Sequence, residues 1–187
     1  MRENNVDIVS MSLGFDRTLE SVETEITQPS AMLFFAAANN DGLNSPELFP
    51  ANFDRVISVR GTSPNGAFNP QYNPSTPFYK RECCYGTLAT DVSCGGPDDT
   101  RLVKSGCSVA TPIMVAIAAA LLLFVDGAYE LQECTYRSRI RKPGEIQRVF
   151  QAMTQDQQQG ERRYLAPWQL LYNKHLHPRE IIKPALV

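Results

Sequence analysis

The sequence predicts an α/β fold in which a parallel sheet carries helices on both faces. Short, nearly continuous apolar runs such as residues 32–38 have the length and composition of strands buried in a parallel sheet. Between two such runs, Leu19, Val22 and Ile26 fall on one face of a helix. Because crossovers between parallel strands are right-handed, helices in this order would cover the faces of the sheet.

The elements are expected in a β-α-β-β order along the first third of the chain. Apolar runs predict strands over residues 7–13, 32–38 and 55–59, and the amphipathic stretch predicts a helix over residues 17–27. Residues 65–76 are rich in Asn and Pro and predict an irregular loop. An apolar helix is expected after Ser108, followed by a charged turn over residues 137–142 and a helix over residues 145–153.

Composition limits the classes of partner. The chain has 187 residues, which suits one domain, and its formal net charge of −2 gives no basic footprint for nucleic acid. Residues 113–125 form an apolar run shorter than the roughly 20 residues of a membrane span. The first residues lack a signal-peptide pattern, so we expect a cytoplasmic protein that binds neither nucleic acid nor a membrane.

The cysteines favour a reducing compartment. There are five, an odd number, and two of them are adjacent at Cys83 and Cys84. None of them follows a Cys-x-x-Cys spacing, so the sequence predicts no metal site and no cofactor.

Residues 105–112 place a serine at the beginning of an apolar helix. A serine hydroxyl is a weak nucleophile unless a base removes its proton and nearby donors stabilise the developing oxyanion. The free N–H groups and the positive dipole end of a helix start provide such stabilisation. Ser108 is therefore a candidate nucleophile. The alternative is an ordinary helix start, with a small capping residue and Pro112 in the first turn.

Two motifs resemble those of the subtilisin-like serine peptidases, or subtilases. Residues 106–112 read GCSVATP and resemble the nucleophile motif Gly-Thr-Ser-x-Ala-Thr/Ser-Pro, with Cys107 in place of Thr. Residues 36–42 read AAANNDG and resemble the segment Ala-Ala-Gly/Ser-Asn-Asp/Glu-Gly, whose Asn donates to the oxyanion. The resemblance implies that Ser108 is the nucleophile and that Asn40 is the oxyanion donor. The alternative for Asn40 is a simple turn.

The resemblance also implies a substrate-binding strand. Residues 7–14 look like the subtilase strand whose free edge pairs with an extended peptide. The substrate-binding residues implied are Ser12, Leu13, Gly14, Ala37 and Ala38. An ordinary core strand that closes in a turn is the alternative for Ser12, Leu13 and Gly14.

The similarity extends along most of the chain. Residues 143–153 and 164–171 look like the end of intracellular fungal subtilase domains, which are often joined to other modules. We therefore expect residues 1–171 to be the C-terminal portion of a subtilase domain and residues 172–187 to be a polar tail. The Asp and His motifs of subtilases precede the substrate strand, and neither is present here. The N-terminal part of the fold is thus expected to be missing.

The function implied is that of a serine endopeptidase acting on polypeptides, nearly inactive in this chain alone because the Asp and His are absent. We expect a fragment, with a short pseudoenzyme as the other explanation. Two other functions stay open. One is a non-catalytic remnant that binds peptides or has a regulatory role. The other is an α/β-hydrolase with Ser108, Asp126 and His175 as its triad, since residues 106–110 are close to a Gly-x-Ser-x-Gly elbow.

Overall fold

A five-stranded parallel sheet forms the centre of the molecule. The computed structural model describes residues 6–42, 45–74, 84–128, 134–154, 162–173 and 175–187. The strands lie in the order β1-β2-β3-β4-β7, with every neighbouring pair parallel. Their bounds are Ile8–Met11 for β1, Leu33–Ala37 for β2, Val56–Thr62 for β3, Cys84–Leu88 for β4 and Arg162–Tyr164 for β7.

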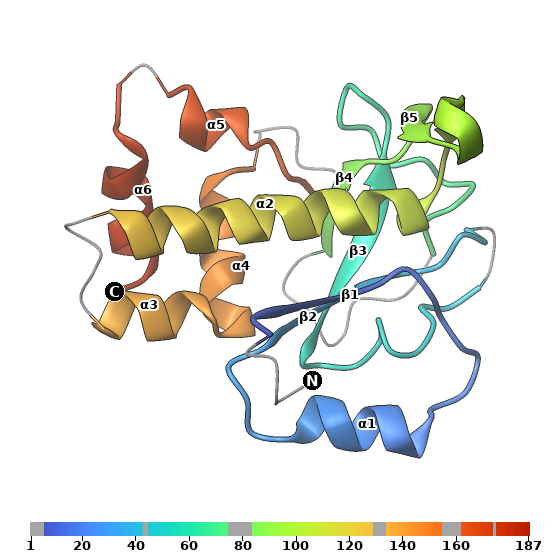
Figure 1. Ribbon diagram of the computed structural model, residues 1–187, viewed down its shortest axis with the longest axis horizontal. Coiled ribbons are helices and arrows are strands. Elements are labelled where there is room, and N and C mark those ends of the chain that lie inside the picture. The colour runs from blue at the N-terminus through green and yellow to red at the C-terminus, as the bar shows by residue number, and fades with distance from the viewer. Residues whose placement is uncertain (1–5, 43–44, 75–83, 129–133, 155–161, 174) are drawn as a thin grey trace.

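Helices cover both faces of this sheet, as the sequence predicts. Successive side chains of a strand point to opposite faces. In β2, Phe35 belongs to the core cluster under helix α2 (Cys107–Gly127), whereas Phe34 packs with Ile26 of helix α1 (Glu20–Thr27). Figure 1 shows α2 crossing one face of the sheet and α1 lying away from it beyond β1 and β2. The predicted α/β class is confirmed.

Further elements complete the described part of the chain. Helices α3 (Cys134–Ile140), α4 (Pro143–Ala152), α5 (Trp168–Leu171) and α6 (Pro178–Ala185) follow α2. An antiparallel pair, β5 (Val92–Gly95) and β6 (Arg101–Lys104), is joined through the short 3-10 helix η2 (Pro97–Asp99) and leads directly into α2. This pair lies at the end of α2 where the helix begins (Figure 1).

Two expectations for the second half of the chain need correction. The charged turn expected over residues 137–142 is mostly helix α3, which buries Tyr136 and Ile140. The polar tail expected over residues 172–187 includes α6, and it buries Ile182 and Leu186 completely. Each pair is spaced four residues apart and so lies on one helical face, which suffices to dock a largely polar helix.

Helix α2 is longer than the apolar run from which it was predicted. It begins at Cys107 and has 21 residues, and its most apolar window has a mean hydropathy of 2.4. Within the described residues it is the one helix long and apolar enough to cross a membrane, so the short length of the run 113–125 does not by itself exclude a membrane span. Core helices meet the same criterion, and α2 packs on β1, β2, β3 and β4.

A buried ion pair joins β3 to the chain that precedes it. Arg60 of β3 is 1% exposed, and its Nη2 donates to Glu47 Oε1 at 3.0 Å. Ser58 Oγ donates to the same carboxylate oxygen at 2.5 Å, and Arg60 Nη1 donates to the Pro74 carbonyl at 2.8 Å. The charges therefore compensate each other in a region without solvent.

An ion cluster joins the end of α2 to α3 and β1. Arg141 donates to Asp126 at 2.8 Å and to Asp7 at 2.9 Å, and Arg137 lies 3.3 Å from Asp126. The hydrogen bond from Arg141 is the main cause that lowers the pKa of Asp126 below its ordinary value of 3.8. This cluster fixes Asp126 in a structural role.

Replacing Arg60 with Ala is expected to lower the free energy of unfolding by about 3–5 kcal/mol, because it removes the buried guanidinium group that binds the Glu47 carboxylate. The measurement is chemical denaturation. Arg148→Ala is the matched control, since Arg148 is 59% exposed in its pair with Glu145. We expect the control to cost less than about 1 kcal/mol. Equal losses would contradict the burial argument.

Stability should also fall in acid through Asp126. Because its folded pKa is lowered, the stabilisation is present above pH 3.8 and is lost as the pH falls through the lowered value. Asp126→Asn should therefore be less stable at neutral pH and should lose less stability below about pH 4 than the unchanged chain. Thermal unfolding across pH measures this, with the exposed Asp54→Asn as control. Parallel curves for all three proteins would refute it.

Candidate active site

The turn before α2 depends on a glycine. Gly106 caps the helix with φ of 125° and ψ of 168°, a conformation that glycine alone adopts without strain. Its N–H donates to the Ala89 carbonyl, just beyond β4, at 2.8 Å. A Cβ added to Gly106 would lie 2.7 Å from Asn40 Oδ1. Gly106 therefore allows the first turn of α2 to approach Asn40 closely.

The side chain of Asn40 joins the end of β2 to the start of α2. Asn40 Oδ1 accepts a hydrogen bond from the Cys107 N–H at 2.7 Å, and Asn40 Nδ2 donates to Ser108 Oγ at 3.2 Å. The turn that carries it is held by Asn39, whose Oδ1 accepts the N–H groups of Asn40 and Asp41. The two residues predicted from separate motifs thus meet in space.

A second donor lies beside Ser108 Oγ. The first N–H groups of a helix have no partner within the helix. The Cys107 N–H donates to Asn40 Oδ1, and the N–H groups of Val109 and Ala110 donate to the Gly106 carbonyl. Within the described residues the Ser108 N–H has no such partner. This N–H and the Asn40 amide are the two donors available to an oxyanion formed at Ser108.

Ser12 contacts Ser108 through its side chain. Pro112 has no N–H, so the Ser108 carbonyl four residues earlier cannot make its helical hydrogen bond. Ser12 Oγ donates to this carbonyl at 2.9 Å. The end of β1 is thereby tied to the first turn of α2. Ser12 and Leu13 are exposed, and their pairing with a substrate backbone stays a prediction.

The predicted contact between Ala38 and substrate is wrong. Ala38 is 0% exposed, its N–H donates to the Val59 carbonyl, and its carbonyl accepts the Leu48 N–H. Ala37 is also buried, at 6% exposure, and its role in substrate binding stays a prediction. Ala38 belongs to the core and helps to hold the Asn39–Asn40 turn, because its backbone is bonded both to Val59 of β3 and to Leu48.

Cys107 is a buried core residue. Its side chain is fully buried and its Sγ lies 3.1 Å from the Tyr72 carbonyl. Burial raises the pKa of the Cys107 thiol above its ordinary value of 9.0. A neutral thiol directed into the core is not a nucleophile, which leaves Ser108 as the candidate nucleophile of this turn.

The α/β-hydrolase alternative is wrong. Asp126 lies eighteen residues after Ser108 in the same helix, about 27 Å along its axis, and it is bound by Arg137 and Arg141. His177 caps α6, and its ring lies 6.4 Å from that of Phe124 near the same far end of α2. His175, two residues before His177, is exposed and cannot span the distance to Ser108. Neither predicted partner reaches the serine.

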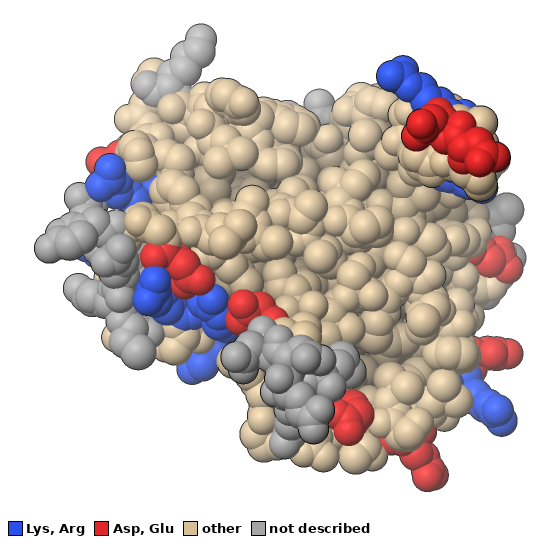
Figure 2. Space-filling model, in the orientation of Figure 1, with Lys and Arg blue, Asp and Glu red and all other residues tan. Residues whose placement is uncertain are grey.

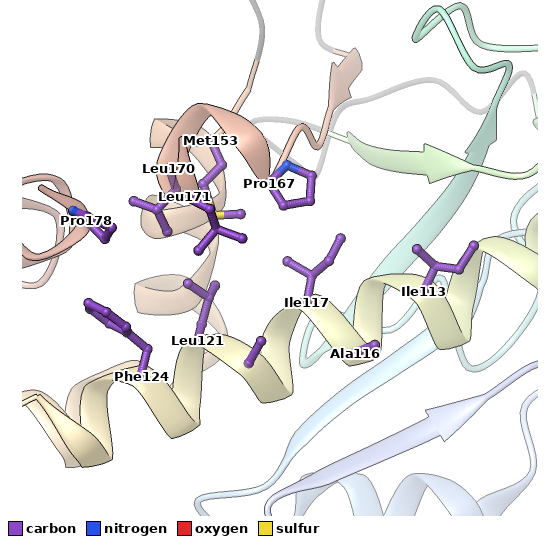
Figure 3. Close-up of a pocket in the computed structure, with 11 residues that line it drawn as sticks. Ile113, Ala116, Ile117, Leu121, Phe124, Met153, Pro167, Leu170, Leu171 and Pro178 are labelled. Atoms are coloured by element: carbon purple, nitrogen blue, oxygen red, sulfur yellow. The ribbon is translucent and has the colours of Figure 1, made fainter. Parts of the chain in front are cut away.

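An apolar cavity of about 350 Å³ lies along α2 but does not include Ser108. Figure 3 shows its walls, formed by α2 on one side and by the segment around α5 on the other. No charged group lines it, so it offers nothing to hydrolytic chemistry. The lining residues are Ile113, Ala116, Ile117, Ala120, Leu121, Phe124, Met153, Pro167, Leu170, Leu171 and Pro178.

The fold and the site define a class of protein: a parallel α/β domain with a serine in the first turn of a core helix and an amide donor on its hydroxyl. The subtilase family model matches residues 1–142, and the chain belongs to the subtilase family. A comparison with curated proteins found no match.

Two solved structures share the fold. The prenylagaramide maturation protease PagA is 21% identical with a TM-score of 0.70, and the whole chain covers 64% of it. The protease domain of PatA, solved as an S218A mutant, is 21% identical with a TM-score of 0.63; 83% of this chain covers 55% of it. The chain thus spans less than two thirds of the length of either protein.

Replacing Gly106 with Ala should displace the Asn40 side chain, because the added Cβ would meet Asn40 Oδ1 and the backbone is strained for any other residue. We expect a loss of about 1–3 kcal/mol in unfolding free energy. Denaturant titration measures it. Gly144→Ala, where a Cβ meets no atom within 4 Å, is the matched control and should lose nothing. A tolerated Gly106→Ala would contradict the described turn.

Proposed function

We propose that this chain is the serine-bearing part of a subtilisin-like serine endopeptidase. The observation that carries the proposal is the 3.2 Å hydrogen bond from Asn40 Nδ2 to Ser108 Oγ at the start of α2. An amide donor and a backbone N–H beside one serine hydroxyl are the groups that acyl transfer requires for its tetrahedral intermediate. Membership of the subtilase family supports the same reaction.

In this proposal Ser108 Oγ attacks the carbonyl carbon of a peptide bond. The carbonyl oxygen becomes an oxyanion, which the Asn40 amide and the Ser108 N–H stabilise, aided by the dipole of α2. In subtilisin itself, loss of the side-chain donor lowers kcat by roughly 10²–10³-fold. A general base takes the Ser108 hydroxyl proton and gives it to the leaving amine, and the resulting acyl-Ser108 is then hydrolysed by water.

The general base must come from elsewhere. The sequence has two histidines, and both belong to the C-terminal segment beside the far end of α2. We propose that the His and the Asp of the triad lie on polypeptide outside these 187 residues. The chain spans 64% of PagA and 55% of PatA, so both solved proteins contain further chain.

The uncovered face of α2 supports this arrangement. Pro112, Ala116, Ala120 and Leu123 follow one face of the helix, are all exposed and are all apolar, with Leu123 72% exposed. Figure 2 shows that the middle of this side of the molecule carries no charge and that charged side chains gather at its rim. β1 is also the last strand of its sheet among the described strands. Further chain packed on this side would cover both the apolar face of α2 and the free edge of β1.

The remaining expectations are proposals of the same kind. We propose an extended polypeptide as substrate, paired along Ser12, Leu13 and Gly14. We also propose a cytoplasmic location and a relation to intracellular fungal subtilase domains with fused modules. Among the described cysteines, Cys94 and Cys107 are free thiols, which suits a reducing compartment.

A second candidate is a non-catalytic remnant that captures extended peptides. It is favoured by the exposed end of β1 and by the distance of both histidines from Ser108. The two functions differ in one requirement. Peptide capture does not need the Ser108 hydroxyl, whereas acyl transfer does.

A fluorophosphonate probe tests the proposed function, since it phosphonylates only an activated serine. We expect the 187-residue chain to label at Ser108 at least about 10⁴-fold more slowly than an intact subtilase, because it lacks a base. The longer reading frame upstream of Met1 should encode Asp-Thr-Gly and His-Gly-Thr motifs. Protein made from that frame should label rapidly, as measured by intact-protein mass spectrometry.

Controls separate the alternatives. Ser108→Ala in the longer protein should abolish labelling, and Asn40→Ala should slow it by roughly 10²–10³-fold. Ser93→Ala, which removes an exposed hydroxyl on β5, should change nothing. Rapid labelling of the 187-residue chain would refute the claim that its base is missing. An upstream frame without both motifs would favour the peptide-binding remnant.

A further inference from the structure

The apolar cavity along α2 is formed in part by the end of the chain. Helix α2 forms one wall, and the opposite wall consists of side chains that follow α3. All of these lie beyond residue 142, where the match to the subtilase family model ends. The cavity is therefore separate from the Ser108 site and involves a part of the chain outside that match. The residues of the second wall are Met153, Pro167, Leu170, Leu171 and Pro178.

The cavity has the size and the lining of a site for an apolar small molecule. Its volume is about 350 Å³, and ligand pockets in proteins range from roughly 300 to 1,000 Å³. None of its lining side chains is polar. Protein interiors contain few voids larger than a water molecule, and apolar cavities stay dry. The cavity therefore favours a hydrocarbon group over a polar one.

The cavity is elongated along the helix. Ile113 lies at one end, and Phe124 and Pro178 lie at the other (Figure 3). The eleven residue steps from Ile113 to Phe124 correspond to about 16 Å of helix axis. An extended hydrocarbon chain of roughly twelve carbons has this length. The shape therefore suits an unbranched chain that lies parallel to α2.

The exposed face of α2 lies beside the cavity. Ile113 and Ile117 are about 100° round the helix from Pro112 and Ala116, so they point toward α5 while the exposed face points away from it. Further chain on the exposed face, as in the proposed function, would lie next to the cavity along its Ala116 border.

A hollow of about 460 Å³ adjoins the Phe124 end of the cavity and carries a positive charge. Phe124 lines both spaces, and Arg179 and His177 line the hollow. Arg179 Nε donates to His177 Nδ1 at 3.0 Å, which uses one of the five N–H donors of the guanidinium. Because His177 Nδ1 is an acceptor, the proton of the neutral ring is on Nε2. A guanidinium beside an Nε2–H donor suits a carboxylate.

The acids near this end of α2 are bound to other groups. The Glu180 carboxylate accepts the His177 N–H at 2.8 Å as part of the cap of α6. Asp126 is bound by Arg137 and Arg141. Neither carboxylate lines the cavity or the hollow. An anionic group in the hollow would therefore meet the charge of Arg179 without an acid on the lining.

We propose that the cavity binds the hydrocarbon chain of a medium-chain fatty acid of about ten to twelve carbons, with its carboxylate against Arg179 and His177 in the hollow. The methylene chain would replace water along α2, and the two polar groups would fix its direction. This site does not use Ser108, so the inference is independent of the proposed function.

The dependence of affinity on chain length tests this in the unchanged 187-residue chain. Hexanoate, octanoate, decanoate, dodecanoate and tetradecanoate are titrated by isothermal calorimetry, each below the concentration at which it forms micelles. We expect one ligand per chain and an affinity that rises about two- to fourfold with each methylene up to dodecanoate. Tetradecanoate should gain less than about twofold over dodecanoate, because its last carbons would lie outside the cavity.

Substitutions at the two ends separate the chain from the carboxylate. Arg179→Gln should weaken dodecanoate by at least about 10-fold and leave dodecanol unchanged, and the exposed Arg148→Gln is its matched control. Ala120→Leu should fill the cavity and weaken both compounds by at least about 10-fold. Its control is Ala152→Leu, at an exposed position of α4 outside the cavity. Ser108→Ala should bind dodecanoate as tightly as the unchanged chain.

Several results would overturn the assignment. Affinity that rises at full slope to tetradecanoate, several ligands per chain, or no calorimetric signal would each do so without any variant. Equal effects of Ala120→Leu and Ala152→Leu would place the ligand elsewhere, and loss of binding in Ser108→Ala would place it at the candidate active site.

Two further results would assign the cavity to another occupant and so overturn the proposal. A dimer in sedimentation that Ala120→Leu dissociates would make the occupant a second copy of the chain. Binding of dodecanoate by the 187-residue chain but not by the longer protein would make it the additional chain. The proposed function is tested separately by the fluorophosphonate probe.

Discussion

The two hydrogen bonds of the Asn40 amide hold the sheet and helix α2 together at the site. Its oxygen accepts the Cys107 N–H and its nitrogen donates to Ser108 Oγ, so the position needs one acceptor and one donor on the same planar group. An ionised Asp would offer only acceptors and could not donate to the serine. The close approach also needs Gly106, whose missing Cβ leaves room for the amide.

Three strands of the sheet anchor the turn that carries Ser108. The chain after β1 reaches it through Ser12 Oγ, the chain after β2 through Asn40, and the chain after β4 through the Ala89 carbonyl. All three contacts lie at the carboxyl ends of parallel strands, where open α/β sheets place their sites. Pro112 contributes indirectly, because its missing N–H frees the Ser108 carbonyl for Ser12.

The sequence predicts this site better than it predicts the rest of the fold. Ser108 and Asn40 each lie in a short local motif, and β2 and α2 are strongly apolar. β4 is missed because it includes Thr87 and Gly86, and Gly86 is covered by Phe68 and Thr62 from elsewhere in the chain. The Glu47–Arg60 pair is missed for the same reason, since charged residues are buried here only because they meet in space.

The bare face of α2 and the missing base have one explanation within the proposed function. Pro112 lies one turn after Ser108 on the same side of the helix and begins the exposed apolar face that continues through Ala116, Ala120 and Leu123. A segment that covered this face would exclude water from α2. Where it reached Pro112, it would lie about one helical turn, or 5.4 Å, from Ser108. A histidine at that point could reach Ser108 Oγ. The burial that α2 lacks and the proton acceptor that Ser108 lacks would then be supplied by the same segment.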